Sequence, residues 1–454
     1  MRRNSAWLAA VLSFVFPGLG HAYLGRRRAA LVFALPALVT TFAMALNLLT
    51  GVVGALAFAI TPSGSLTWLV LIALTGIWRI IAIADAVLVA RRAGDPHALG
   101  GLVVGVLCIG LVVGMHGLPA YYAYSVFDAS SSIFVGRNPD QAGGTPGASS
   151  SLDPLASAVP SDIGYNATPF ATPPTASSRI TILFTGIDSD PRRTEALTDT
   201  LLVVSVNPKD GSVTMASMPR DVSNFPMYNG TTYTGKINSL MTWAAGHPQQ
   251  YPDGPFPTLI HELTFLMGVR INYYAAVNLG GFRQIVDLVG GVTVDNPKVI
   301  NDPAYDWLDG TSGFYLPAGT VTLDGRTALA YVRSRQGVGD NDFTRARRQQ
   351  QLLLALRAKL TQPGMLLKLP DILNVAKQTV RTDLPTSRFE DFVNLAQNID
   401  TSKVQTFVLG PNVYASQPPM SQTGGVYELV LDMARIKTWS IAQFGADSTY
   451  SPAP

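Results

Sequence analysis

The chain has 454 residues, of which 47 % are hydrophobic and only 14 % are charged. Soluble proteins average about 25 % charged residues, so we expect part of this chain to lie in a membrane. The net charge of +3 is too small to indicate a nucleic-acid-binding protein, and the single cysteine excludes an internal disulfide or a multi-cysteine zinc site.

The first part of the chain contains three apolar stretches that are long enough to cross a bilayer. Residues 29–49 and 99–124 carry no formal charge, and residues 66–90 carry only Arg79 and Asp85. Because a span needs about 20 apolar residues, we predict three transmembrane helices. The two charges are either a functional intramembrane pair or an ion pair inside the bundle, unless Asp85 reaches the cytoplasmic end of its helix.

Residues 6–24 are also apolar, but Pro17 and its flanking residues interrupt them. This break predicts a re-entrant or interfacial hairpin, and the spans that follow make a cleaved signal peptide the weaker reading. Basic clusters flank the spans, whereas residues 50–65 carry no charge. Since basic loops stay in the cytoplasm, we expect a multi-pass protein of the cytoplasmic membrane whose part after residue 124 is extracellular.

Composition and sequence pattern divide the chain into four regions. The membrane region is expected at residues 1–127, and residues 128–178 are rich in Pro, Ser, Gly, Ala and Thr, which predicts a disordered linker. Residues 179–412 alternate between strand and helix patterns, so we predict an α/β domain with helices on both faces of a central sheet. Residues 413–454 are weakly patterned and are predicted to be a tail without an assigned role. The expected strands are 180–187, 201–206, 212–218 and 271–277, and the expected helices are 257–267, 280–288, 324–331 and 343–360.

Two aspartates lie at the ends of neighbouring predicted strands. Asp188 ends the first strand, and Asp199 precedes the second. Carboxylates placed in this way could share one hard cation such as Mg²⁺ or Mn²⁺, although either one alone is more typical of a turn or a helix cap. Arg220 and Asp221 follow the third strand, and as an isolated pair they indicate only a surface ion pair.

A denser cluster of basic residues follows the predicted helix at 324–331. Arg333 and Arg335 are two residues apart, so in an extended segment they point the same way. Arg345, Arg348 and Gln349 share one face of the next helix. Guanidinium groups bind phosphate oxygens in pairs, and the absence of lysine from residues 331–349 argues against an ordinary solvated surface. The cluster predicts an anion-binding site.

These segments occur in the order found in the LytR-CpsA-Psr family of cell-wall ligases, which the chain resembles from about residue 179 to 360 and more faintly to 411. The most specific feature is Arg-x-Arg followed by Asp-Phe-x-Arg-x-x-Arg-Gln within residues 333–349. The resemblance implies an extracytoplasmic α/β/α domain with a central mixed sheet. It also implies a transferase of cell-wall biogenesis that moves a glycopolymer from a polyprenyl-pyrophosphate carrier to peptidoglycan through a phosphodiester, and releases polyprenyl phosphate. The complete set of matching segments is 182–188, 198–200, 219–221, 235–238, 290–292 and 331–349.

The resemblance also implies roles for individual residues. Asp188 and Asp199 would hold Mg²⁺ or Mn²⁺, and Asp342 would orient the arginines with support from Arg348. The lipid would enter an apolar tunnel between the sheet and the helices. The residues that would bind the pyrophosphate are Arg220, Arg333, Arg335, Arg345 and Gln349; of these, Arg220, Arg333 and Arg335 join the two aspartates as the catalytic set.

The sequence departs from the family pattern at Leu197, where arginine is common. Either Arg192 or Arg193 substitutes from the same loop, or the site binds pyrophosphate more weakly. Two alternatives to transfer stay open, namely a membrane-tethered sensor of polyprenyl phosphates or anionic glycans, and a hydrolytic variant of the same site. The general base and the identity of the polymer also stay open. The predicted topology and the lack of a recognisable DNA-binding helix pair argue against a transcriptional regulator.

Overall fold

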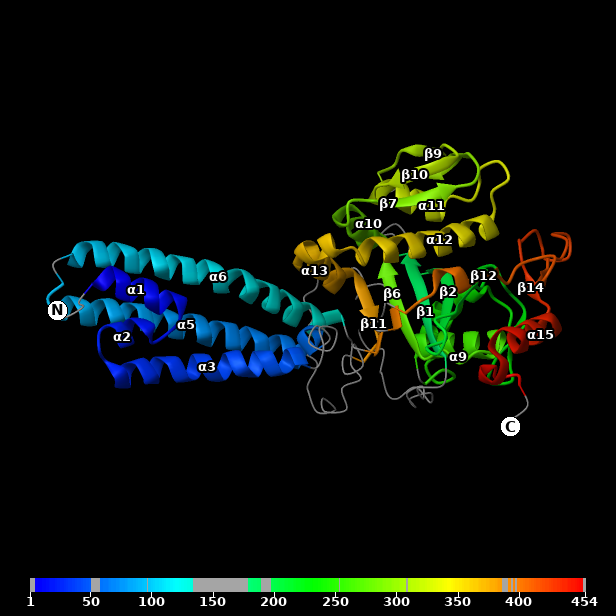
Figure 1. The fold of residues 1–454 in the computed structure, drawn as a ribbon. Coiled ribbons are helices and arrows are strands. Elements are labelled where there is room, and N and C mark those ends of the chain that lie inside the picture. Colours follow the sequence, from blue (N-terminus) through cyan, green and yellow to red (C-terminus); the bar gives the residue numbers. More distant parts are fainter. Residues whose placement is uncertain are drawn as a thin grey trace. The chain divides into compact units, whose positions relative to one another are not determined.

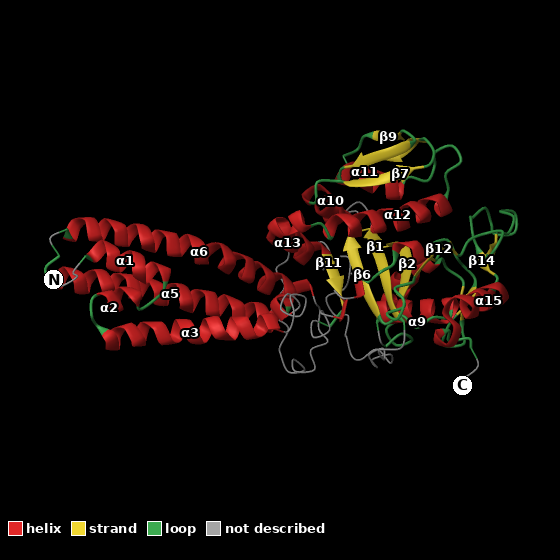
Figure 2. Cartoon of the chain, viewed as in Figure 1, coloured by secondary structure: helices red, strands yellow, loops and turns green. Residues whose placement is uncertain are grey.

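The computed structural model describes residues 5–49, 58–95, 97–133, 179–188, 197–252, 254–307, 309–385, 391–392, 395–396 and 398–451. The chain divides into two compact units, residues 1–131 with 386–393 and residues 132–385 with 394–454. Figure 1 shows that the first unit is helical, and Figure 2 shows that the second combines helices with a sheet. Each unit is described by itself. The greater part of the predicted linker, residues 134–178, lies outside the described residues.

Helices long and apolar enough to cross a membrane make up most of the first unit. They are Arg27–Leu46 in α3, Pro62–Arg92 in α5, and Leu99–Ile133 in α6. The helix α6 continues to Ile133, so the predicted start of the linker at residue 128 is wrong. The chain remains helical there because residues 125–133 keep helix-compatible residues and contain neither proline nor glycine. The helices of this unit are α1 (Ala6–Val15), α2 (Leu19–Tyr23), α3 (Arg27–Leu49), α5 (Pro62–Arg92) and α6 (Ala98–Ile133).

The chain reverses between α1 and α2, at the break seen in the sequence. Gly18 adopts φ +96°, and a Cβ there would lie 2.4 Å from the carbonyl oxygen of Ala30, so only glycine fits this turn. The ten residues of α1 span about 15 Å at the usual helical rise. Because this is about half the thickness of a bilayer core, α1 is too short to cross a membrane.

Charged side chains complete both ends of α1. The Arg79 guanidinium donates to the carbonyl oxygens of Phe14 (2.8 Å) and Val15 (3.0 Å), and the Asp95 carboxylate accepts from the N–H of Ala6 at 2.8 Å. Each charge interacts favourably with the helix dipole at its end of α1, and each satisfies backbone groups that have no hydrogen-bond partner within the helix. Arg79 is therefore not paired with Asp85, and the expected ion pair between them is corrected.

Asp85 has a different partner. Its carboxylate lies 2.9 Å from Nε2 of His21, which is fully buried and stacks on Phe33 with ring centroids 4.5 Å apart. His21 lies in α2 and Phe33 in α3, so this contact links the hairpin to the longer helices. Arg79 and Asp85 of α5 thus serve separate contacts within the first unit.

The second unit is built on a six-stranded mixed sheet with the order β11-β6-β1-β2-β3-β12. Strand β1 is parallel to β6 and antiparallel to β2, while β3 is antiparallel to β2 and parallel to β12. The predicted α/β class with a central mixed sheet is confirmed. The strands are β1 (Ile180–Asp188), β2 (Leu197–Val206), β3 (Val213–Ser217), β6 (Tyr273–Asn278), β11 (Val380–Thr382) and β12 (Val404–Val408).

Helices contact both faces of this sheet. On one face, Leu183 and Ala216 belong to a buried core with Leu263 of α9. Because neighbouring residues of a strand point to opposite faces, Ser217 lies on the other face, where its hydroxyl accepts a hydrogen bond from Gln350 of α12 at 2.9 Å. The helices of this unit are α8 (Leu240–Gly246), α9 (Pro255–Met267), α10 (Leu279–Leu288), α11 (Gly325–Arg333), α12 (Asp342–Leu360), α13 (Leu369–Thr379) and α15 (Met433–Phe444).

Short strands outside the central sheet form a second packed region that the sequence analysis left unassigned. Strands β7 and β10 pair with each other, as do β8 and β9. Together with α10, α11 and α12 they enclose a second core that contains Val292, Phe314 and the fully buried Tyr331. These strands are β7 (Val292–Asn296), β8 (Ile300–Asp306), β9 (Ser312–Leu316) and β10 (Gly319–Leu323), and the remaining short pairs are β4 (Phe225–Pro226) with β5 (Thr232–Tyr233) and β13 (Ala415–Ser416) with β14 (Val430–Leu431).

The residues after 412 are an integral part of the second unit. Leu429 and Ile436 are fully buried, and Trp439 and Phe444 are each 5 % exposed in the same core as the central sheet. The predicted domain boundary at residue 412 is therefore wrong. The apolar residues of this C-terminal segment are widely spaced, so the sequence shows no strong local period. They nevertheless pack against distant segments of the chain in one core.

Candidate functional site

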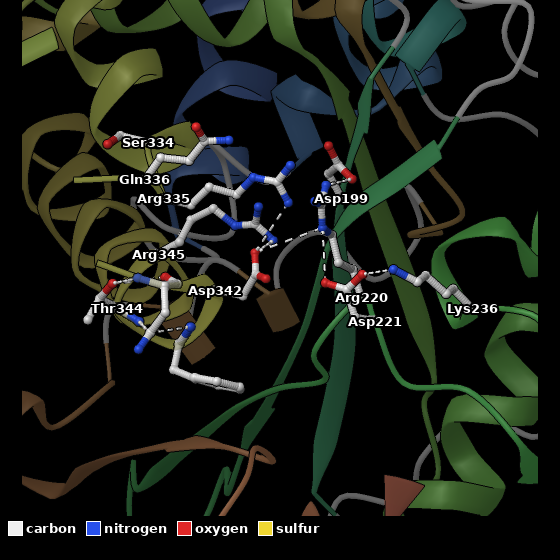
Figure 3. Close-up of polar contacts among 12 residues, drawn as sticks. Asp199, Arg220, Asp221, Lys236, Ser334, Arg335, Gln336, Asp342, Thr344 and Arg345 are labelled. Atoms are coloured by element: carbon white, nitrogen blue, oxygen red, sulfur yellow. Dashed lines mark hydrogen bonds and ion pairs between the residues drawn. The ribbon is translucent and has the colours of Figure 1, made fainter. Parts of the chain in front are cut away.

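The side chains of the candidate site come from strand β2, the loop after strand β3, and the start of α12 (Figure 3). In the pairing of β1 with β2, Gly186 lies opposite Thr200 and Ile187 lies opposite Thr198. This register leaves Asp199 as the extra residue of a β-bulge, a feature that re-aims side chains beside functional sites. Arg220 follows the end of β3 at Ser217.

Arg220 lies at the centre of the cluster. Its Nη1 is 2.7 Å from Oδ1 of Asp199, and its Nε is 3.5 Å from Asp221 and 3.9 Å from Asp342. The side chain is only 13 % exposed. Burial alone would lower the pKa of Arg220, but the carboxylates, led by Asp199, outweigh it and raise that pKa above its usual value. Arg220 is thus a fixed positive charge in a partly dehydrated setting.

Asp342 connects the remaining arginines. Its Oδ1 is 2.9 Å from Nη2 of Arg345 and 4.0 Å from Nη1 of Arg335, in addition to the contact with Arg220. Burial raises the pKa of Asp342 even though Arg345 and Arg220 act to lower it. The residue begins α12, and Asn341 and Thr344 form a capping box at that end. The predicted orienting contact of Asp342 is present for these three arginines.

The charges of this network do not balance. A fourth cation, Lys236, pairs with Asp221, so among the side chains that the structure describes four cations face three carboxylates. Arg335 is the most accessible of the arginines in it, with 41 % of its side chain exposed. An excess of positive charge with an open guanidinium on the solvent side fits an anionic ligand.

A buried carboxylate anchors the turn that carries Arg335. Asp302 of β8, 2 % exposed, accepts a hydrogen bond from the hydroxyl of Ser334 at 2.7 Å. It also accepts from the backbone N–H groups of Arg335 and Gln336, each at 3.2 Å. Three hydrogen bonds to one carboxylate oxygen fix the backbone on both sides of Arg335. Asp302 is therefore a positioning residue for this arginine.

Arg348 supports the same turn from α12. It donates to the carbonyl oxygen of Ser334 and lies 3.2 Å from Asp340. Its guanidinium also lies 5.5 Å from the centre of the Tyr331 ring. These contacts hold α11 against the beginning of α12, and they involve neither Arg220 nor Asp342.

Two residues of the predicted pyrophosphate-binding set have other contacts. Arg333 is the last residue of α11, with Ser334 as its C-cap, so residues 333–335 are not an extended segment. Its side chain hydrogen-bonds Tyr305, whereas Arg335 faces Asp342. The expectation that these arginines point the same way is wrong, because the period of two holds only for strands. Gln349 donates to the carbonyl oxygen of Val332 at 3.3 Å.

Several predicted site residues lie outside the described part of the structure. These are Arg192 and Arg193, together with the side chains of Asp188 and Leu197. The backbone of Asp188 pairs with that of Leu197, which places the positions of Asp188 and Asp199 at the same end of adjacent strands. Their shared metal and the role of the neighbouring arginines stay predictions.

The described residues are compatible with a divalent cation that also binds the substrate. Among them, no group of three or more His, Cys, Asp or Glu side chains is arranged to hold a metal ion. Mg²⁺ often binds through only one or two carboxylates and completes its shell with phosphate oxygens and water. Asp199 uses Oδ1 on Arg220 and is 25 % exposed, which suits this mode.

The sequence analysis missed three residues that contribute to the site. Asp221 was seen only as a neighbour of Arg220, and Lys236 only as part of a matching segment. Both lie in segments shared with the family, which was the available signal. Asp302 had no such signal, because the strand that carries it was not predicted.

The structure thus combines helices long and apolar enough to cross a membrane with an α/β domain that carries a cluster of guanidinium groups beside its central mixed sheet. The chain belongs to the LytR_cpsA_psr family, whose sequence profile matches residues 148–440. This confirms the resemblance found in the sequence.

Named relatives are similar over part of their length. The polyisoprenyl-teichoic acid–peptidoglycan teichoic acid transferase TagU of Halalkalibacterium halodurans is 32 % identical over 210 residues, which cover 46 % of this chain and 62 % of that protein. TagU of Bacillus subtilis is 31 % identical over 186 residues, covering 41 % and 54 %. The matched segment thus spans less than two thirds of each. The crystal structure of B. subtilis TagV is 24 % identical with a TM-score of 0.47, and covers 61 % of this chain and 99 % of that one.

Proposed function

We propose that this protein is a phosphotransferase that attaches a polyprenyl-pyrophosphate-linked glycopolymer to peptidoglycan on the outer face of the cytoplasmic membrane. Membership of the family and the transferase activity for which the TagU relatives are named support this proposal. Helices long enough to anchor the chain in the membrane that holds a lipid-linked donor support it as well.

The observation that carries the proposal is the convergence of arginines on Asp342. Arg220 and Arg335 come from two separate loops and Arg345 from α12, yet all three lie within 4.0 Å of the same carboxylate oxygen. Bringing like charges together is unfavourable unless anions neutralise them. A diphosphate has oxygens enough to bind several guanidinium groups at once.

The reaction follows from this arrangement. A hydroxyl oxygen of peptidoglycan forms a bond to the phosphorus that bears the glycan, and the bond from that phosphorus to the bridging oxygen breaks. The bridging oxygen leaves with its electron pair as part of polyprenyl phosphate, and the hydroxyl proton passes to a base. Arg220, Arg335 and Arg345 stabilise the negative charge that shifts toward the leaving phosphate.

The same proposal includes a divalent cation. Asp199, joined by Asp188, would hold Mg²⁺ or Mn²⁺, which would neutralise phosphate charge when bound. Because Arg220 already contacts Asp199 at 2.7 Å, it would hold this carboxylate in place. Arg333 and Gln349 would complete the set of donors to the diphosphate, since each side chain has more than one N–H group.

The test uses the purified full-length chain in detergent with a polyprenyl-pyrophosphate oligosaccharide, Mg²⁺ and soluble peptidoglycan fragments. We expect covalent glycan on the peptidoglycan and an equal amount of polyprenyl phosphate. Release of free phosphorylated glycan would instead identify a hydrolase. Tight binding of the donor without turnover would identify a sensor, and either result would overturn the proposal.

A further inference from the structure

A small pocket in the second unit is lined by a segment that leads directly to Lys236 of the charged network. It has a volume of about 260 Å³ and is lined by residues 231–235 together with Trp243, Gln250 and Tyr251. Ligand pockets for drug-sized molecules have about 300–1,000 Å³. The pocket is therefore suited to a single small ring.

One residue that lines this pocket is the sequence neighbour of a member of the charged network. Gly235, which lines the pocket, precedes Lys236, and the ammonium group of Lys236 pairs with Asp221. Figure 3 shows Lys236 reaching toward Asp221 beside Arg220. A group bound in the pocket would thus contact Gly235, the residue that directly precedes Lys236 of the network.

Trp243 gives the pocket an aromatic surface that is held in place. The indole is 44 % exposed, although it stacks on His247 with ring centroids 3.8 Å apart and meets the edge of Tyr233 at 6.0 Å. Nδ1 of His247 lies 2.8 Å from the carbonyl oxygen of Trp243, which fixes the stacked ring. An exposed tryptophan between two such neighbours offers a rigid apolar surface with little entropy to lose on binding.

The other lining side chains are polar but uncharged. Thr232, Thr234 and Gln250 are exposed, and they supply hydroxyl and amide groups that both donate and accept hydrogen bonds. Among the described residues, the lining contains no Lys or Arg, so a second phosphate group would find no counter-charge from them. A lipid chain would leave these polar groups unsatisfied.

A pyranose ring combines the two properties that this lining would recognise. Its axial C–H bonds form an apolar face that packs on an aromatic ring, and its hydroxyl and acetamido groups lie around the rim. We propose that the Trp243 pocket is a saccharide subsite that holds one sugar of a glycan whose phosphate, or whose acceptor hydroxyl, lies at the arginine network. This rests on the proposed function, which brings a donor glycan and a peptidoglycan acceptor to the same place.

The test is calorimetric titration of the full-length chain in detergent. The ligands are the N-acetylglucosamine–N-acetylmuramic acid disaccharide of peptidoglycan, a lipid-free teichoic acid repeat unit as the probe for a donor glycan, and sugar-free inorganic pyrophosphate. We expect Trp243→Ala to weaken saccharide binding at least tenfold and to leave pyrophosphate binding unchanged. Binding of the disaccharide assigns the pocket to the acceptor, and binding of the repeat unit assigns it to the donor.

Gln250→Ala is a second variant that leaves the aromatic stack intact, and we expect it to weaken the same sugar by at least threefold. Tyr315→Ala removes another exposed aromatic ring, 65 % exposed on β9, and serves as the matched control without effect. The proposal is overturned if the wild-type chain binds neither sugar, or if Trp243→Ala binds both as the wild type does. If the transfer assay fails while sugar binding still depends on Trp243, the proposed function is lost and the subsite stands.

Discussion

Arg335 is the residue of the network whose removal separates function from folding most clearly. Its side chain is 41 % exposed and its contact with Asp342 is long, at 4.0 Å, so it adds little to the stability of the domain. Arg345, by contrast, is 8 % exposed and forms a 2.9 Å ion pair, and removing it would leave Asp342 with less compensation in a buried place.

We therefore predict that Arg335→Ala lowers kcat/KM for glycan transfer at least tenfold, which corresponds to about 1.4 kcal/mol, with little change in melting temperature. The transfer assay and a thermal melt measure the two effects. Arg435→Ala, which removes an exposed arginine paired with Asp432, is the control. Full activity of Arg335→Ala would remove this residue from the site.

Glu262 is a buried carboxyl group in the main core that the proposed mechanism does not use. It is 0 % exposed in α9, and its Oε2 accepts a hydrogen bond from the N–H of Tyr228 at 3.1 Å. Burial raises the pKa of Glu262 to about 8, although this hydrogen bond acts to lower it. The group is thus protonated in the folded protein near neutral pH.

This pKa predicts how stability depends on pH. Between the unfolded value of about 4.3 and the folded value of about 8, the folded state holds a proton that the unfolded state has lost. The free energy of unfolding should therefore fall as pH rises through this window, by at most about 1.4 kcal/mol per pH unit from this group. Urea unfolding followed by near-ultraviolet circular dichroism should show Glu262→Gln losing this slope, whereas Glu428→Gln keeps it.

At the scale of elements, the turn between α11 and α12 depends on Asp302. The three hydrogen bonds to its Oδ2 come from the Ser334 hydroxyl and from the backbone N–H groups of Arg335 and Gln336. The position of Arg335 in this loop is therefore set by a residue on strand β8. Leaving such buried donors without a partner costs about 1–3 kcal/mol.

We predict that Asp302→Ala lowers both stability and transfer activity, while Asp302→Asn keeps more of each because its carbonyl oxygen can still accept hydrogen bonds. Because Asp302 acts through Arg335, the double variant Asp302→Ala with Arg335→Ala should transfer glycan no more slowly than Arg335→Ala alone. Effects that multiply in the double variant would show that Asp302 acts independently.

In the first unit, Arg79 satisfies the end of the short helix α1. Its contacts with the carbonyl oxygens of Phe14 and Val15 replace water that a bilayer would not supply. We predict that Arg79→Met, which keeps an unbranched side chain without donors, speeds amide hydrogen exchange in residues 6–24. Arg92→Ala, at the exposed end of α5, should leave this exchange unchanged. Unaltered protection in Arg79→Met would show that the cap is dispensable.

At the scale of the whole molecule, the C-terminal residues belong to the core of the second unit. Leu429 and Ile436 are fully buried, and Trp439 is 5 % exposed. Loss of one large buried side chain costs about 2–5 kcal/mol, so removal of all three costs about as much as the 5–15 kcal/mol by which a whole domain is stable.

A chain that ends at residue 412 should accordingly fail to give a protease-resistant second unit. A chain that ends at residue 451 should resist proteolysis like the full-length chain, because it keeps the buried residues listed above. Limited proteolysis of both in detergent compares them directly. A protease-resistant core in the shorter chain would show that the domain ends at residue 412, as predicted from the sequence.

The sequence by itself determined the features that arise from local chemistry. Apolar runs specified helices long enough to cross a membrane because about 20 residues match the bilayer. Strand and helix periods specified the α/β class, and the ordered motifs from residue 182 to 349 specified the family. The charges of Arg220, Arg335 and Arg345 were visible because they lie inside these motifs.

Only the tertiary structure decided which of these charges meet. Arg333 and Arg335 are two residues apart, yet a helix end between them sends one to Tyr305 and the other to Asp342. Asp302 and the residues after 412 gain their roles from partners far along the chain, which no local pattern encodes. The physical reason is that periodicity and composition report the conformation of a segment, whereas a binding site depends on distances between segments that are set by packing of the core.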